Sequence, residues 1–222
     1  QQDVITFLLG LGTRAGAIAA VFHILCHASF KAALFMAAGI VDHEAHTRDI
    51  RRLGGLRRLM PVTFAIVLIA TLSMAGVPPL NGFLSKEMML EAAAHTDWLG
   101  NPWLVPVFAT LGAILSVGYC LRFLVQGFLG PVRSDYPHPP HDPGAGLWLP
   151  PALLAVVVVA MGLWPMAVAG PLVDAAAGAV TGTQVHAKIA LWHGWESPAL
   201  WMSLLAFGGG FVIWGSYARL RV

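Results

Sequence analysis

The 222-residue chain has little charge: Asp, Glu, Lys and Arg make up 11% of it, against roughly 25% in a soluble domain. Cysteine is rarer still. Cys26 and Cys120 both fall in apolar segments, which predicts two small buried hydrophobic side chains and no disulfide. The sequence contains no nucleotide-binding glycine motif, no cysteine cluster for an iron–sulfur centre and no haem signature. We therefore expect no cofactor here, and any redox chemistry would lie in other chains.

Long uncharged stretches take the place of the missing charge. Residues 59–85 and 143–173 contain no Asp, Glu, Lys or Arg, and the mean hydropathy is +0.72. Each stretch is long enough for a helix of about 20 residues to cross the hydrocarbon core of a bilayer. A buried helix of a soluble enzyme would show shorter runs. The sequence predicts an all-α, multi-span transmembrane helical bundle. Its start at Gln1, without a signal-peptide pattern, suggests a segment of a longer protein.

The hydropathy pattern predicts one partial span and five fuller ones, one of them interrupted. They are residues 4–13, 16–41, 60–96, 103–129, 147–169 and 198–217. The interruption is expected at residues 77–82, where two prolines and a glycine disfavour a regular helix. The alternative is a hairpin with both prolines outside the membrane. However, residues 60–77 barely suffice to cross alone and residues 83–96 are too short, which favours one discontinuous helix.

The remaining charges gather in loops on one predicted side. Five arginines in residues 42–59, Arg133 in residues 130–146 and two arginines at the C-terminal end make eight basic residues, against Arg14 and Lys188 on the other side. The positive-inside rule predicts that both loops and the C-terminal end are cytoplasmic in a multi-pass protein of the cell membrane. The basic residues flank spans and the net charge is +2, so nothing indicates nucleic-acid binding.

His23, His27 and Lys31 recur at every fourth position of the span 16–41, so they share one face of a helix. Ionisable groups inside a membrane cost about 2.5–3.5 kcal/mol each, which makes them functional candidates. Histidine exchanges protons near neutral pH, so the row suits a proton relay. The alternative is a polar stripe that holds helices together by hydrogen bonds. Ile24 stands where a zinc protease has its glutamate, and we predict no metal site.

Lys86 and Glu87 form the second intramembrane site, directly after the interruption. Helix breaks are tolerated in membranes only where they pack in protein or face water, and transporters use them beside ion paths. We expect Lys86 to be a charge near mid-membrane, with Glu87 or Glu91 as its partner. Snorkelling of the lysine toward the surface is the alternative. Arg122 is a third candidate, which snorkelling explains equally well.

Three segments resemble the antiporter-like, proton-conducting membrane subunits that respiratory complex I shares with Mrp-type cation/proton antiporters. They are residues 23–39 with the His-His-Lys row, the loop 42–56, and residues 76–87 with Pro-Pro-Leu-Asn-Gly before Lys-Glu. Within this family the chain looks most like the A-type subunit of an Mrp-type antiporter. The segments that favour it are Asp-His-Glu at 42–44, Thr-Arg-Asp at 47–49 and Leu-Trp-His-Gly at 191–194.

The resemblance implies an inverted-repeat transporter fold, with residues 1–129 in its second half and residues 130–222 as additional C-terminal helices. It implies a subunit of a monovalent cation (Na⁺)/H⁺ antiporter, which is not itself an enzyme, with other membrane subunits as partners. The residues implied to translocate protons are His23, His27, Lys31, Lys86 and Glu87. The alternative is a proton-pumping membrane subunit of NADH:quinone oxidoreductase, which would be part of an enzyme.

Overall fold

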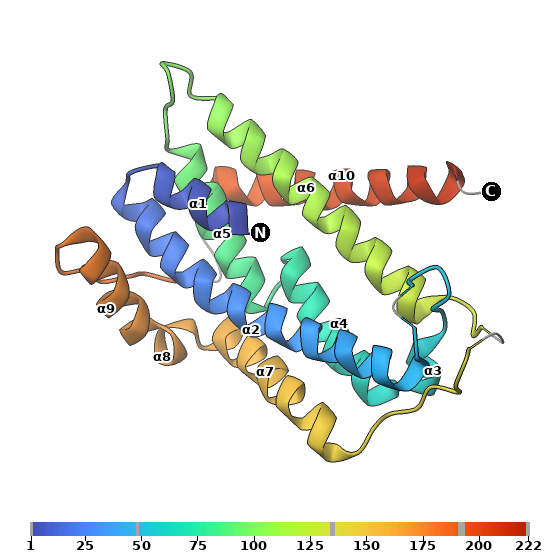
Figure 1. Ribbon diagram of the computed structural model, residues 1–222. Coiled ribbons are helices and arrows are strands. Elements are labelled where there is room, and N and C mark those ends of the chain that lie inside the picture. Colours follow the sequence, from blue (N-terminus) through green and yellow to red (C-terminus); the bar gives the residue numbers. More distant parts are fainter. Residues whose placement is uncertain (1, 48, 134–135, 191–193, 221–222) are drawn as a thin grey trace.

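The computed structural model describes residues 2–47, 49–133, 136–190 and 194–220, and these residues contain helices and no strand (Figure 1). The helices are α1 Gln2–Gly10, α2 Arg14–Ala45, α3 Leu56–Leu59, α4 Pro61–Ala75, α5 Asn81–Ala94, α6 Leu104–Leu124 with the π-helical turn η1 Val125–Leu129, α7 Ala145–Leu163, α8 Pro165–Val168, α9 Gly170–Thr181 and α10 Pro198–Leu220. Four of them, α2, α6 with η1, α7 and α10, are long and apolar enough to cross a membrane. The predicted all-α, multi-span bundle is confirmed.

Helix α2 is the element on which the other helices are arranged. The hydroxyl of Thr13 accepts a hydrogen bond from the amide of Gly16 at 3.0 Å and caps the helix start. The helix then runs for 32 residues, or about 48 Å, which exceeds the roughly 30 Å of a hydrocarbon core. It contacts α1, α4, α5, α7 and α9, so the positions of these helices can be described along the length of α2.

The predicted discontinuous helix is present as α4 and α5. The chain leaves the helix at Gly76, whose φ is +88°, and re-enters it at Asn81. The break therefore covers residues 76–80, where residues 77–82 are predicted. The side-chain amide of Asn81 donates to the hydroxyl of Ser29, at the midpoint of α2, at 3.0 Å. Helix α5 ends beside the start of α2, where His95 and Thr13 line one pocket.

The two half-helices therefore run in the same direction, one after the other, along opposite halves of α2 (Figure 1). With 15 and 14 residues, they measure about 22 and 21 Å. Neither alone would span a hydrocarbon core of roughly 30 Å. A hairpin would return the chain to the side from which α4 came, and α5 does not do so.

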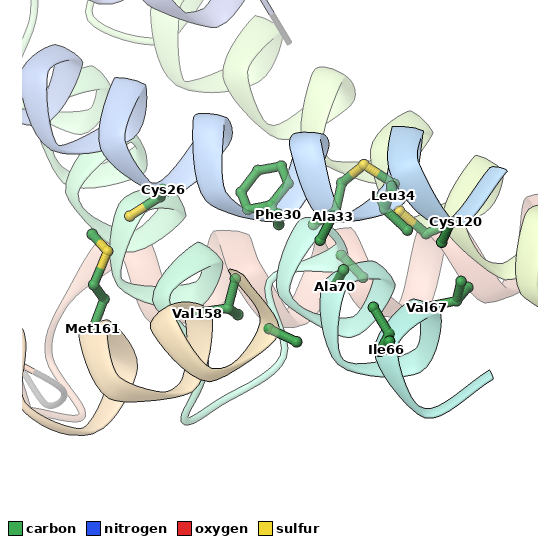
Figure 2. Close-up of a cluster of buried hydrophobic side chains, with 14 of the residues drawn as sticks. Cys26, Phe30, Ala33, Leu34, Ile66, Val67, Ala70, Cys120, Val158 and Met161 are labelled. Carbon is green, nitrogen blue, oxygen red and sulfur yellow. The ribbon is translucent and has the colours of Figure 1, made fainter. Parts of the chain in front are cut away.

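Small side chains bring α2, α4 and α7 close together. Ala33 on α2 and Ala70 on α4 are both fully buried, with larger neighbours such as Phe30 and Val158 filling the space around them (Figure 2). Helices in a bilayer gain little from the hydrophobic effect, so close van der Waals packing of this kind is what holds them. Cys26 and Cys120 are both free and buried, as predicted.

The span predicted at 147–169 is present as α7, but the helix ends earlier than predicted. Helix α7 ends at Leu163, and Trp164 has a non-helical backbone with φ −128° and ψ 58°. Pro165 explains the interruption, because proline disfavours a helical conformation in the residue before it. The chain continues through α8 into α9, a helix that the hydropathy pattern did not predict. Helix α9 ends beside the start of α2, where Thr181 and Arg14 line one pocket.

Helix α10 crosses α6 (Figure 1), and two of its glycines lie against side chains of α6. A methyl group on Gly210 would lie 2.5 Å from the side chain of Val117, and one on Gly209 would lie 3.0 Å from Ile114. At the far end, the guanidinium of Arg122 lies 4.6 Å from the ring centre of Tyr217. Arg122 thus packs on an aromatic face between two helices, an arrangement that neither snorkelling nor a role in transport requires.

The loops 42–59 and 130–146 meet at one end of the bundle. The hydroxyl of Tyr136 donates to the carbonyl of Gly54 at 2.7 Å and accepts from its amide at 2.8 Å. The buried carboxylate of Glu44 lies 3.0 Å from the ring of His43 and 2.9 Å from that of His141. Both loops therefore lie at the same end of the bundle.

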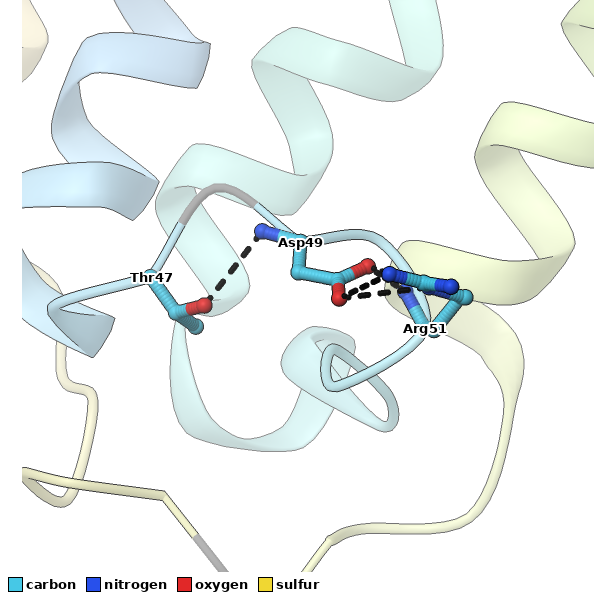
Figure 3. A network of polar contacts seen from close by, with 3 residues as sticks. All are labelled: Thr47, Asp49 and Arg51. Carbon is cyan, nitrogen blue, oxygen red and sulfur yellow. Dashed lines mark hydrogen bonds and ion pairs between the residues drawn. The ribbon is translucent and has the colours of Figure 1, made fainter.

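A short polar turn in the first loop is organised by Asp49 (Figure 3). Its carboxylate accepts from Arg51 Nε at 3.0 Å and from a terminal guanidinium nitrogen at 2.9 Å, and its amide donates to Thr47 at 3.3 Å. These hydrogen bonds from Arg51 hold the pKa of Asp49 below its usual value. Since the shift is downward, the pair is present at neutral pH and is lost only as the pH falls through that lowered pKa.

The first turn of α4 is capped by Asp142, which comes from the other loop. Its carboxylate accepts from the amides of Val62 and Thr63 at 2.8 and 2.9 Å. We expect Asp142→Ala to lower the free energy of unfolding by about 1 kcal/mol, because two amides at the helix start lose their acceptor. The thermal unfolding midpoint of the full-length protein in detergent measures this. Asp97→Ala, at an exposed position, is the control, and an equal midpoint for both variants would contradict the capping role.

Candidate functional site

The break between α4 and α5 is held by a group of buried polar side chains. Ser73 donates to the side-chain oxygen of Asn81 at 2.6 Å, and its hydroxyl accepts from the amide of Gly82 at 3.0 Å. Asn81 in turn donates to Ser29 of α2. All four residues are buried. The backbone amide of Gly82, at the start of α5, is thus satisfied by a side chain of α4. A helix break inside a membrane is tolerated only where such groups pack in protein or face water.

Lys86 reaches from the second turn of α5 back to the end of α4. Its ammonium donates to the carbonyl of Ala75 at 2.7 Å and to the hydroxyl of Ser116 on α6 at 3.4 Å. The last carbonyls of a helix have no partner within the helix and carry partial negative charge, so a cation is favoured there. A methyl group on Gly76 would lie 2.7 Å from Lys86 Cδ. The glycine thus leaves room for the lysine stem.

His23, His27 and Lys31 lie on one side of α2, as their spacing predicts. The rings of His23 and His27 are stacked with their centres 5.8 Å apart. His23 is buried, and its Nδ1 lies 2.5 Å from the hydroxyl of Ser85 on α5. The ammonium of Lys31 lies 6.0 Å from the ring centre of Tyr119 on α6. The row therefore faces α5 at one end and α6 at the other.

A cavity of about 330 Å³ lies between α1, α2, α5 and α6. His23 and Lys86 line it from two helices, and Ser116 and Tyr119 line it from α6. Tyr119 also lies beside Lys31, so one aromatic side chain adjoins both the cavity and the lysine of α2. The cavity could hold water in contact with groups that exchange protons.

Glu87 and Lys86 are adjacent in the chain, but their hydrogen bonds go to different helices. Its carboxylate accepts a hydrogen bond of 2.6 Å from the hydroxyl of Ser203 on α10. Glu91, one turn later, accepts from Ser197 at 3.1 Å. Lys86 contacts the end of α4 and α6 instead. Among the described residues, Lys86 thus contacts α4 and α6 in place of the expected neighbouring glutamate, and Glu87 contacts α10.

The structure adds several polar residues that sequence reasoning missed. Serines 85, 116, 197 and 203 and Tyr119 each contact or adjoin a predicted site residue. Single hydroxyl groups in apolar spans are common and give little signal in a sequence. Ser203 on α10 and Ser197 directly before it both contact α5. They could be identified only once α10 was known to lie against α5.

Residues 4–116 match the family described as the membrane region of NADH:quinone oxidoreductase and Mrp antiporters. A probable K⁺/H⁺ antiporter A/B subunit of Rhizobium meliloti is 45% identical over 98% of this chain and 22% of its own length. The Na⁺/H⁺ antiporter A1 subunit of Staphylococcus saprophyticus is 40% identical over 88% of this chain and 25% of its own length. The chain thus spans about a quarter of these relatives.

Two solved structures are similar in fold. The Mrp complex of Dietzia sp. DQ12-45-1b contains a chain with a TM-score of 0.84 and 35% identity, over 98% of this chain and 23% of that one. Respiratory complex I of Thermus thermophilus gives a TM-score of 0.65 and 29% identity, over 78% of this chain and 36% of that one. With half of its residues matched, this chain belongs to the NADH:quinone oxidoreductase/Mrp antiporter membrane family.

Proposed function

We propose that this chain is part of a subunit of a monovalent cation/H⁺ antiporter and that protons cross it through the groups around the break. The observation that carries the proposal is the cavity that His23 of α2 and Lys86 of α5 line together. Two ionisable side chains from separate helices meet there at the end of a half-helix. Buried groups of this kind are costly in a membrane and mark ion paths.

In the proposed path, Lys86 holds a proton at the end of α4, where its ammonium donates to the carbonyl of Ala75. The proton passes from its ammonium to water in the cavity or to the hydroxyl of Ser116. Tyr119 leads on to Lys31, and Ser85 leads to His23 and then His27. Each transfer leaves the donor ready to accept the next proton.

The sides of the membrane and the coupling ion follow as further parts of the proposal. The basic loops 42–59 and 130–146 and the C-terminal end face the cytoplasm of the cell, since arginines are retained on that side. Other membrane subunits complete the assembly, and residues 130–222 extend the transporter domain of residues 1–129. The relatives carry names with K⁺ and with Na⁺, and Na⁺ is the cation we propose.

The proposal is tested in inside-out vesicles that contain the full-length protein with its partner subunits. A pH gradient is formed, Na⁺ or K⁺ is added without NADH, and a pH-sensitive dye is followed. We expect the gradient to collapse when one of these cations is added. If the cations have no effect and NADH oxidation builds a gradient, the protein is a proton-pumping subunit of the complex I kind, which the second structural similarity favours as the alternative.

A further inference from the structure

A second row of polar side chains runs along α5, on the side that meets α10. Glu87, Glu91 and His95 follow each other at intervals of four residues, which stacks them on one helix face. The ring nitrogen Nδ1 of His95 lies 3.0 Å from the backbone carbonyl oxygen of Glu91 and 3.5 Å from a carboxylate oxygen of the same residue. Lys86 lies on another face of α5, where it lines the cavity together with His23. The row is therefore separate from that cavity.

Exposure rises steadily along the row. Glu87 is 4% exposed, and the side chains of Glu91 and His95 are 40% and 67% exposed. The last two residues line an open pocket at the end of α5, together with Thr13 and the basic side chain of Lys188. The row therefore leads from a buried carboxylate near the helix break to the surface where α2 begins.

Two buried serine hydroxyl groups, one on α10 and one directly before it, donate hydrogen bonds to carboxylates of this row. Ser203 is 8% exposed and donates to Glu87, and Ser197, directly before the helix, is 7% exposed and donates to Glu91. A buried hydroxyl is costly unless it has a hydrogen-bond partner. Both of these serines have a carboxylate as partner, which fixes where the carboxylate points.

We propose that the α5–α10 row is a proton path, in which Glu87, Glu91 and His95 carry protons between the helix break and the surface, and Ser203 and Ser197 are positioning residues. This inference rests on the proposed function and extends it to one exit or entry of the proton. One helical turn separates the two carboxylates, about 6 Å along the axis. A protonated Glu87 gives its proton to a bridging water, which passes one of its own to Glu91, and Glu87 is left as a carboxylate. His95 then takes the proton on a ring nitrogen.

The test measures cation-driven proton flux in vesicles that contain the full-length protein with its partners, across a range of pH. We expect Ser203→Ala and Glu91→Gln each to slow flux by about tenfold and to move its pH dependence, because a proton-transfer group is lost or misplaced. Ser203→Thr keeps a hydroxyl and should retain most of the flux. Ser216→Ala on the exposed part of α10 and Glu196→Gln on the surface are the matched controls, and they should behave as the unmodified protein does.

A purely structural role for the serines is distinguished by a spectroscopic readout. Infrared difference spectra should show a shifted carboxyl band in Ser203→Ala relative to the unmodified protein and to Ser203→Thr. If Ser203→Ala and Glu91→Gln assemble and keep normal flux and pH dependence while Lys86→Met has none, the path is wrong and the proposed function stands. If the unmodified protein shows no cation-driven flux, the proposed function fails, and the path fails with it.

Discussion

Lys86→Met should abolish cation-driven proton flux while the protein still assembles with its partners. Methionine has nearly the length of the lysine stem and fits the space beside Gly76, so packing changes little. The proton-holding group in the cavity is nevertheless gone, and the carbonyl of Ala75 loses its donor. Removing a group that transfers protons commonly costs a factor of 10² to 10⁴ in rate, so we expect at least about a hundredfold loss. Flux is measured with a pH dye in vesicles, and assembly is measured by recovery of the intact complex.

Lys86→Arg tests whether position 86 needs only a positive charge or a group that can release and regain a proton. Arginine keeps a cation near the end of α4, but it stays protonated at every physiological pH and cannot release its proton. We expect an assembled, inactive complex from this variant too. Arg57→Met, an exposed change of charge in α3, is the control and should transport normally. Normal flux in assembled Lys86→Met would remove Lys86 from the proton path.

Helix periodicity and span length account for most of what the sequence predicts correctly. The side of α2 that holds His23 and Lys31 follows from a spacing of four, and α4 and α5 are each too short to span alone. Helix α9 could not be found by the same reasoning, because 12 residues fall below the length of a membrane span. The interruption at Trp164 was visible in Pro165, but a single proline within an apolar run often leaves a membrane helix intact.

The partners of the site residues could not be predicted from the sequence. The spacing on α2 fixes the side on which His23 lies, but Ser85 becomes its partner only through the way α5 packs against α2. Glu87 shows the same limit. Its neighbour in sequence is Lys86, yet α10 supplies Ser203 as a hydrogen-bond donor from 116 residues further along the chain. The spacing of residues within one helix predicts the side on which a side chain lies. Its hydrogen-bond partner depends on which helices pack together.

Gly82→Ala is expected to prevent assembly, although it adds only one methyl group. That methyl would overlap the backbone carbonyl of Ser73, which is part of α4 and has no rotamer with which to move aside. The amide of Gly82 also donates to the Ser73 hydroxyl at 3.0 Å, so separating the two half-helices would break the contact that closes the interruption. Overpacking of a buried site costs about 1–3 kcal/mol or more, and the lost hydrogen bonds of buried groups add about 1–3 kcal/mol. The yield of intact complex in detergent measures the effect.

Two further variants decide whether close packing at the break is the cause. Gly162→Ala on α7 would place a methyl against the carbonyl of Pro79, so α7 presses on the break from another helix, and a similar loss of complex is expected. Gly146→Ala lies near the start of α7 with no neighbouring atom within 4 Å of the added methyl, and it should assemble normally. If Gly82→Ala assembled and transported like the unmodified protein, α4 and α5 could not be packed as tightly as the Ser73–Asn81 contacts require. The position of Lys86 at the end of α4 depends on that packing, so the same result would weaken the structural basis of the proton path.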